Sequence, residues 1–191
     1  MVFCGEKHLR DTGGTEEEKI MNGLVQVYTG DGKGKTTAAL GLAVRAFGAG
    51  LRVCIAQFVK TGGSGEVLAM QERIPEITLK QYGADDFVTQ PPKPEDIACA
   101  REGLKNIRNI IQSGEYDLVI LDEANVAVHL GLFPVEELLE VIDTKPAEME
   151  VVITGRNAHP RVIERADLVT EMRAVKHYYR DGVEARPGIE R

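Results

Sequence analysis

The chain has 191 residues, of which 43% are hydrophobic and 28% are charged, with a formal net charge of -7 at pH 7. This composition is typical of one ordinary globular domain, and it excludes disordered, collagen-like and disulfide-scaffold proteins. Nucleic-acid binders normally carry a basic face, so the negative charge argues against DNA or RNA as the main partner. No apolar run approaches the ~20 residues that span a bilayer, and we expect no membrane partner.

The three cysteines, Cys4, Cys54 and Cys99, are far apart in the sequence and form no CxxC pair. This spacing predicts reduced thiols and excludes a zinc site built from cysteine pairs. The first residues lack the apolar segment of a secretory signal. We therefore expect a cytoplasmic protein.

The first 22 residues differ in composition from the rest of the chain. They are polar and charged, with an acidic run at residues 16–18. We expect residues 1–22 to form a mobile arm, or a lid that orders on binding. Short apolar runs separated by helical stretches follow, and they predict one domain over residues 23–191.

Expected strands alternate with expected helices along this domain. Strands are expected at 24–28, 52–58, 77–82, 117–121, 150–154 and 168–172, and helices at 36–47, 66–73, 94–111, 135–142 and 160–166. Such alternation predicts an α/β fold with a doubly wound, mainly parallel sheet. Ligands of these sheets bind beyond the carboxyl ends of the strands, so the loops that follow the strands should share one rim.

A glycine-rich turn joins the first expected strand to the first expected helix. It reads Gly30-Asp31-Gly32-Lys33-Gly34-Lys35-Thr36-Thr37. Glycines let the backbone N–H groups wrap phosphate oxygens, and the helix that follows directs its positive end at the anion. Lys35 then supplies a cation to the phosphates, and Thr36 a hydroxyl to Mg²⁺. The turn predicts a nucleoside triphosphate site and a P-loop NTPase-like fold of the RecA-like kind.

The match of this turn to GxxxxGK[ST] is imperfect. Thr29 stands at the position of the first glycine, and Gly30 comes one residue late. The loop is therefore either a variant or holds the phosphates in a shifted way. A glycine-rich turn without a ligand is the alternative, and the position between a strand and a helix argues against it.

Two acids, Asp122 and Glu123, end the apolar strand expected at 117–121. In phosphate-loop proteins an acid at this place helps to hold magnesium, directly or through water. A strand that ends in two solvated acids is the alternative, and the phosphate loop makes the functional interpretation the better one. The residues leave open which acid touches the metal.

Two arginines are further candidates. Arg156 follows the strand expected at 150–154, where a guanidinium can neutralise a departing triphosphate. A solvent-exposed arginine is the alternative there. By its spacing alone, Arg45 on the first helix is a surface or packing residue.

Several segments together resemble one family, the ATP:corrinoid adenosyltransferases of the phosphate-loop type, which make adenosylcobalamin. The matching segments are 28–39, 57–60, 64–66, 121–127, 154–158, 166–172, 175–177 and 188–190. The late glycine, an anomaly for an ordinary ATPase, is this family's own form. The resemblance extends from about residue 23 to the end of the chain.

The resemblance implies transfer of the 5′-deoxyadenosyl group of ATP to the Co(I) of cob(I)alamin or a related corrinoid, with release of triphosphate, in adenosylcobalamin synthesis or salvage. Co(I) is already a strong nucleophile, so the protein needs no base and instead aligns cobalt with the 5′-carbon. Lys35, Thr36 with Mg²⁺, and Arg156 suit the stabilisation of the leaving triphosphate. The resemblance also assigns Arg45 to the nucleotide site and favours Glu123 as the metal contact.

One segment departs from the family pattern. Some relatives carry a Phe and Trp pair after the third strand, placed to meet the corrin, whereas this chain has no tryptophan. By resemblance, Phe87 takes the Trp position. Dimers are common in the family, so a homodimer is expected, with a corrinoid reductase as a candidate partner.

Two other functions compete with this transferase. A kinase or NTPase would act at the γ-phosphate, with Glu123 as its catalytic or water-positioning acid. A nucleotide-gated binding module would deliver a corrinoid without chemistry. The products formed from ATP and reduced cobalamin distinguish the three.

Overall fold

The computed structural model describes residues 22–60, 62–83 and 88–190. The expected arm therefore lies outside the described residues except for Asn22, and so does Phe87. The strands are β1 (Val25–Thr29), β2 (Val53–Phe58), β3 (Thr78–Tyr82), β4 (Leu118–Asp122), β5 (Glu150–Thr154) and β6 (Leu168–Glu171). The helices are α1 (Lys35–Gly48), α2 (Gly65–Arg73), α3 (Pro94–Ser113), α4 (Ala124–His129), α5 (Val135–Asp143), α6 (Pro160–Arg165) and the 3-10 helix η1 (Tyr178–Asp181).

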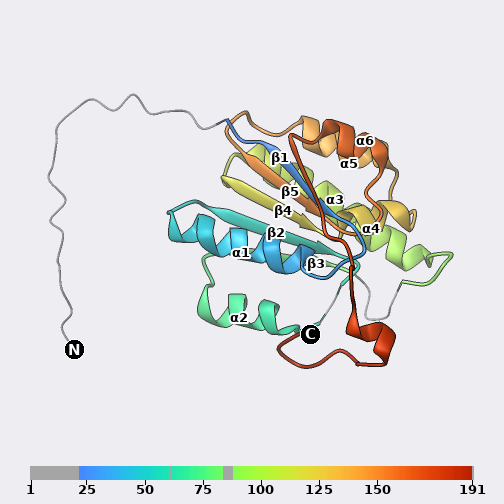
Figure 1. Ribbon diagram of the computed structural model, residues 1–191. Helices are drawn as coiled ribbons and strands as arrows, with labels where there is room; N and C mark the ends of the chain where they lie inside the picture. Colours follow the sequence, from blue (N-terminus) through green and yellow to red (C-terminus); the bar gives the residue numbers. More distant parts are fainter. Residues whose placement is uncertain (1–21, 61, 84–87, 191) are drawn as a thin grey trace, which may run out of the picture.

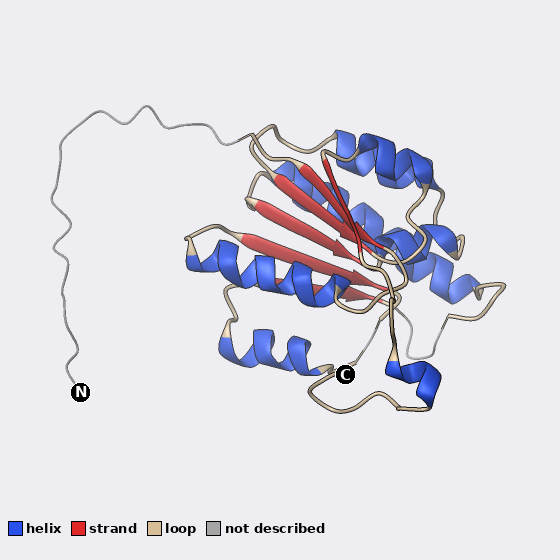
Figure 2. Cartoon of the chain, viewed as in Figure 1, coloured by secondary structure: helices blue, strands red, loops and turns tan. Residues whose placement is uncertain are grey.

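The strands form a six-stranded sheet in the order β3-β2-β4-β5-β1-β6, and every neighbouring pair is parallel. Helices α1 and α2 cover one face of the sheet, and α3, α4, α5 and α6 cover the other (Figure 1; Figure 2). A hydrophobic core lies under each helical layer. The predicted doubly wound α/β fold, of the P-loop NTPase-like class, is confirmed.

Burial along the strands explains why the sequence forms this sheet. All residues of β2 and of β4 are buried, as expected for parallel strands covered on both faces. Residues in the edge strand β6 are all exposed. The predicted strands differ from the observed ones by one residue at most at either end, whereas α4 and η1 were not predicted. In the described ranges, no helix is long and apolar enough to cross a membrane.

Backbone strain gathers at one edge of the sheet. Apart from glycines, the described residues with positive φ are Val59 (64°), Glu123 (60°) and Asn157 (56°). They follow β2, β4 and β5 at the carboxyl edge. A side chain in this conformation costs about 1–2 kcal/mol, and such residues cluster at functional sites. The functional site is therefore expected at the carboxyl edge of the sheet.

Candidate functional site

A cavity of about 740 Å³ opens beside the phosphate loop at this edge. Its walls come from the loop, from the segments after β2, β4 and β5, and from the C-terminal segment. The lining residues are Gly32, Lys33, Gly34, Lys35, Thr36, Thr37, Leu40, Lys60, Gly65, Glu66, Glu123, Arg156, His177, Gly188, Ile189 and Glu190. Small-molecule sites typically occupy about 300–1,000 Å³, so the cavity has the size of such a site.

The phosphate loop lies directly against the end of β6. The backbone N–H of Gly32 donates to the carbonyl of Met172 at 2.7 Å. A Cβ at Gly32 would lie 2.7 Å from that oxygen, and one at Gly30 would lie 2.4 Å from it. Both glycines are therefore required by the contact with Met172. The Gly32 amide points at this carbonyl, so it is not among the amides that face the cavity.

Lys35 is a buried residue in the first turn of α1. Its side chain folds back so that Nζ donates to the carbonyl of Gly32 at 2.7 Å. Burial, and after it the charge of Arg156, lowers the pKa of Lys35. Within the described residues no carboxylate forms an ion pair with this ammonium. Since none of the described carboxylates pairs with it directly, the ammonium remains available to an anion in the cavity.

Behind the loop, the fully buried Asp122 accepts hydrogen bonds from four side chains, those of Thr36, Thr154, Gln57 and Lys60. Thr36 Oγ1 donates to Oδ1 at 2.9 Å, and Thr154 Oγ1 donates to the same oxygen at 2.6 Å. Gln57 Nε2 donates to Oδ2 at 3.2 Å. Because the Thr36 proton is directed at Asp122, the Thr36 oxygen acts as an acceptor, and it accepts a hydrogen bond from the Lys60 ammonium at 3.4 Å.

Lys60 lies between the two acids at the end of β4, Asp122 and Glu123. Its Nζ is 3.4 Å from Asp122 Oδ2 and 3.6 Å from Glu123 Oε1. Burial alone would lower the pKa of Lys60, but Asp122 and Glu123 outweigh it, so the pKa lies above its ordinary value. Burial raises the pKa of Glu123, and Lys60 opposes that shift. A cation is thus stabilised at this place.

The same place suits Mg²⁺. Thr36, Asp122 and Glu123 present only oxygen atoms, which are the ligands that Mg²⁺ prefers. The Lys60 ammonium shows that these oxygens accept a cation. Asp122 already accepts hydrogen bonds from four side chains, whereas Glu123 lines the cavity. Among the described residues no group of three or more His, Cys, Asp or Glu could hold a metal, so a bound Mg²⁺ would also need substrate or water oxygens.

The structure brings most of the predicted site residues together, but not all. Gly32, Lys33, Gly34, Lys35, Thr36, Thr37, Glu123 and Arg156 line the cavity. Gly30, Asp31 and Asp122 are not part of the lining, and the exposed Asp31 carboxylate accepts a hydrogen bond from the Ala174 amide at 3.2 Å. Arg45 lies exposed in the last turn of α1, outside the cavity lining. Phe87 lies outside the described residues.

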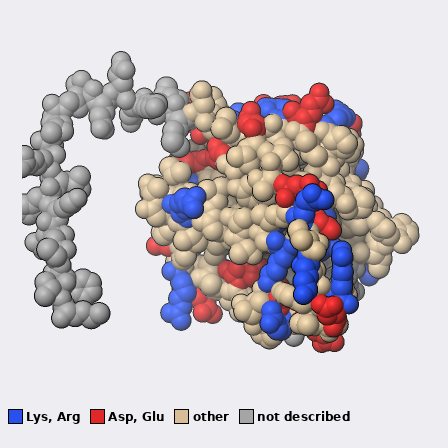
Figure 3. Space-filling model, in the orientation of Figure 1, with Lys and Arg blue, Asp and Glu red and all other residues tan. Residues whose placement is uncertain are grey.

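Sequence reasoning missed several residues of this site. Gln57, Lys60 and Thr154 lie in segments that carry the family resemblance, but sequence reasoning assigned none of them a role. Each lies at or just beyond the carboxyl end of a strand, which is where ligands bind. The C-terminal residues His177, Ile189 and Glu190 likewise lie in segments that carry the family resemblance, but sequence reasoning assigned them no role at the cavity. Figure 3 shows Lys and Arg side chains gathered on one part of the surface, in the region where Figure 1 draws the C-terminal segment.

Comparisons with known proteins agree with this geometry. A family model described as ATP:corrinoid adenosyltransferase BtuR/CobO/CobP matches residues 21–191. A corrinoid adenosyltransferase of Pseudomonas aeruginosa is 37% identical over 169 residues, covering 88% of this chain and 83% of that protein. One from Escherichia coli K12 is 37% identical, covering 88% and 85%, and CobA of Salmonella typhimurium is 36% identical with the same coverage. The chain belongs to the ATP:corrinoid adenosyltransferase family.

Proposed function

We propose that this chain transfers the 5′-deoxyadenosyl group of ATP to the Co(I) of cob(I)alamin or a related corrinoid and releases triphosphate. The observation that carries the proposal is the buried Lys35 ammonium at the phosphate loop, which has no direct ion pair among the described residues and lines a cavity with room beyond the loop. Relatives named corrinoid adenosyltransferases support the same reaction.

The protein's part in this reaction is electrostatic and geometric. The bond between the 5′-carbon and the triphosphate oxygen breaks as cobalt supplies the electron pair of the new bond, and negative charge grows on the leaving triphosphate. Lys35 and Arg156 line the same cavity and carry positive charge toward those oxygens. Preorganised cations of this kind stabilise developing charge without reorganisation during the reaction.

We further propose that Thr36 and Glu123 hold Mg²⁺, with Asp122 acting through Thr36. Bound there, Mg²⁺ would neutralise phosphate charge and orient the triphosphate. Asp122 accepts a hydrogen bond from the Thr36 hydroxyl at 2.9 Å and so keeps the hydroxyl oxygen turned to the cavity. Lys60 would then leave the space between the acids or remain paired with Asp122 alone.

One assay tests the function. The protein is incubated with ATP, Mg²⁺ and chemically reduced cobalamin, and the products are separated. Adenosylcobalamin with an equal amount of triphosphate is the expected result. ADP or phosphate would favour a γ-phosphate reaction, for which the half-buried Glu123 is the candidate acid, and unchanged ATP would favour a binding module. Either of the last two results would overturn the transferase.

The setting of this reaction is also proposed. We place the protein in the cytoplasm as a homodimer, with a corrinoid reductase supplying Co(I), and with neither nucleic acid nor membrane as a partner. Light scattering on the purified protein measures the oligomeric state directly, and a monomer at working concentration would remove the dimer from the proposal.

A further inference from the structure

The C-terminal segment after β6 crosses the phosphate loop and returns to it. At its start it contacts the loop through the Gly32 amide, which bonds to Met172 at 2.7 Å, and through the Asp31 carboxylate, which accepts the Ala174 amide at 3.2 Å. It then forms η1 and comes back so that Ile189 and Glu190 lie beside Lys33. We call residues 177–190 the C-terminal hook.

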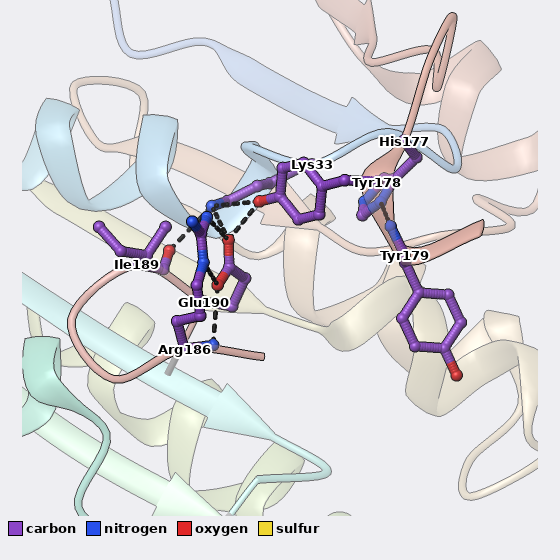
Figure 4. Close-up of polar contacts among 7 residues, drawn as sticks. All are labelled: Lys33, His177, Tyr178, Tyr179, Arg186, Ile189 and Glu190. Atoms are coloured by element: carbon purple, nitrogen blue, oxygen red, sulfur yellow. Dashed lines mark hydrogen bonds and ion pairs between the residues drawn. The ribbon is translucent and has the colours of Figure 1, made fainter. Parts of the chain in front are cut away.

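Lys33 is the loop residue that meets the end of the hook. Its Nζ lies 2.8 Å from the carbonyl of Ile189, 3.1 Å from Glu190 Oε1 and 3.4 Å from the hydroxyl of Tyr178. An ammonium has three N–H donors, and all of them are directed at the hook. Figure 4 shows the side chain of Lys33 reaching into this group.

Glu190 is the centre of the contact. Its carboxylate accepts from Lys33, from the hydroxyl of Tyr178, and from both the amide and the guanidinium of Arg186, at 2.8 Å and 3.0 Å for the last two. The Arg186 guanidinium also lies over the Tyr178 ring, 5.2 Å from its centroid. The Glu190 side chain is only 15% exposed. Charge-assisted hydrogen bonds of this kind are stronger than neutral ones.

The hook forms part of the cavity wall. His177, Gly188, Ile189 and Glu190 line it together with the phosphate loop. Ile189 is 56% exposed and places an apolar side chain in the wall of a cavity that Lys35, Lys60 and Arg156 also line. Any movement of the hook away from Lys33 would therefore open the cavity and remove one of its walls.

We propose that Lys33 and Glu190 form a clasp that holds the C-terminal hook over the nucleotide cavity, and that Lys33 is a positioning residue, not a phosphate ligand. This rests on the proposed function, because the hook closes the cavity assigned to ATP and the corrinoid. It changes the role expected for Lys33 from its place in the glycine-rich turn. Lys35, not Lys33, then carries the charge that faces the phosphates.

Hydrogen–deuterium exchange of residues 177–190 tests the clasp without any ligand. The variants are Lys33→Met, Glu190→Gln and the pair together, with Lys105→Met on the exposed side of α3 and Glu184→Gln in the hook as matched controls. We expect each single variant to speed exchange by about 3- to 10-fold, the effect of losing one partly exposed charge-assisted contact. The double variant should exchange at the same rate as the single variants, because both changes break the same contact. Lys33→Arg keeps the positive charge and should exchange as slowly as the parent. Unchanged exchange in Lys33→Met would overturn the clasp.

ATP affinity then separates a clasp from a phosphate ligand. For a clasp, Lys33→Met and Glu190→Gln both weaken ATP binding, by similar factors of about 3- to 10-fold, because both release the same wall. For a phosphate ligand, Lys33→Met weakens binding by about 100-fold or more, while Glu190→Gln frees the ammonium and tightens binding. Effects of opposite sign would therefore refute the proposal.

The clasp and the transferase reaction can be refuted separately. If exchange in the hook rises as expected but no adenosylcobalamin forms in the unmodified protein, the clasp stands and the proposed reaction does not. If adenosylcobalamin forms but the hook exchanges equally in all variants, the reaction stands and the clasp does not.

Discussion

Thr36 and Asp122 are joined by a 2.9 Å hydrogen bond from the threonine hydroxyl to Oδ1 of the carboxylate. The bond links the first turn of α1 to the end of β4, which are 86 residues apart in the sequence. Thr154 donates to the same oxygen at 2.6 Å, so the carboxylate joins three segments of the carboxyl edge. Asp122 thus serves both the fold and the orientation of the candidate Mg²⁺ ligand.

Asp122→Asn should therefore lower both the stability of the fold and the affinity of the site for Mg²⁺. One amide oxygen replaces two carboxylate oxygens, and the new NH₂ group meets donors where it needs acceptors. We expect a loss of about 1–3 kcal/mol in the free energy of unfolding, measured by urea denaturation. Asp181→Asn, at an exposed residue of η1, is the control and should change stability little. Equal stability of the two variants would contradict this account of Asp122.

Lys35→Met should abolish ATP binding without unfolding the domain. Burial lowers the pKa of Lys35, which means that its charge is disfavoured in the ligand-free protein, so a methionine of similar shape should be tolerated. Removing the charge should weaken ATP binding by about 100-fold or more. Calorimetric titration measures the affinity, with Lys105→Met as the control. A variant that binds ATP as tightly as the parent would refute the assignment of Lys35.

ATP binding should take up protons at alkaline pH. The lowered pKa of Lys35 means that part of the ligand-free protein has lost this proton below the ordinary value of about 10.4. Triphosphate oxygens favour the charged form and raise the pKa again, so binding draws a proton from the buffer. Affinity should consequently fall as pH rises through the lowered pKa. Titrations in buffers of different ionisation enthalpy measure this uptake, and proton release on binding would have the wrong sign.

Gly32→Ala should disrupt the loop, and Gly41→Ala should not. A Cβ at Gly32 would lie 2.7 Å from the Met172 carbonyl, which is backbone and cannot move away easily, whereas a Cβ at Gly41 in α1 meets nothing within 4 Å. We expect Gly32→Ala to weaken ATP binding markedly. Gly41→Ala should raise the free energy of unfolding by about 0.5–1 kcal/mol through helix propensity. Thermal unfolding and ATP titration of both variants check the pair, and an unchanged ATP affinity in Gly32→Ala would count against the contact with Met172.

The predicted part of this fold came from local patterns. Short apolar runs and helical periodicity placed all six strands to within one residue at either end, because burial on both faces of a parallel sheet requires continuous apolar segments. Helix α4 was not predicted, because it begins directly after β4 and has only six residues, too few for a periodic pattern.

By itself the sequence determined the phosphate loop, its junction with α1 and the acids after β4, since these depend on residue order over a few positions. Only the tertiary structure decided how each side chain is used. It directs Lys33 to Glu190 at 3.1 Å, 157 residues away, and places Lys60 between Asp122 and Glu123. The position of a long, flexible side chain depends on which charge the fold brings near it, and no local pattern carries that information.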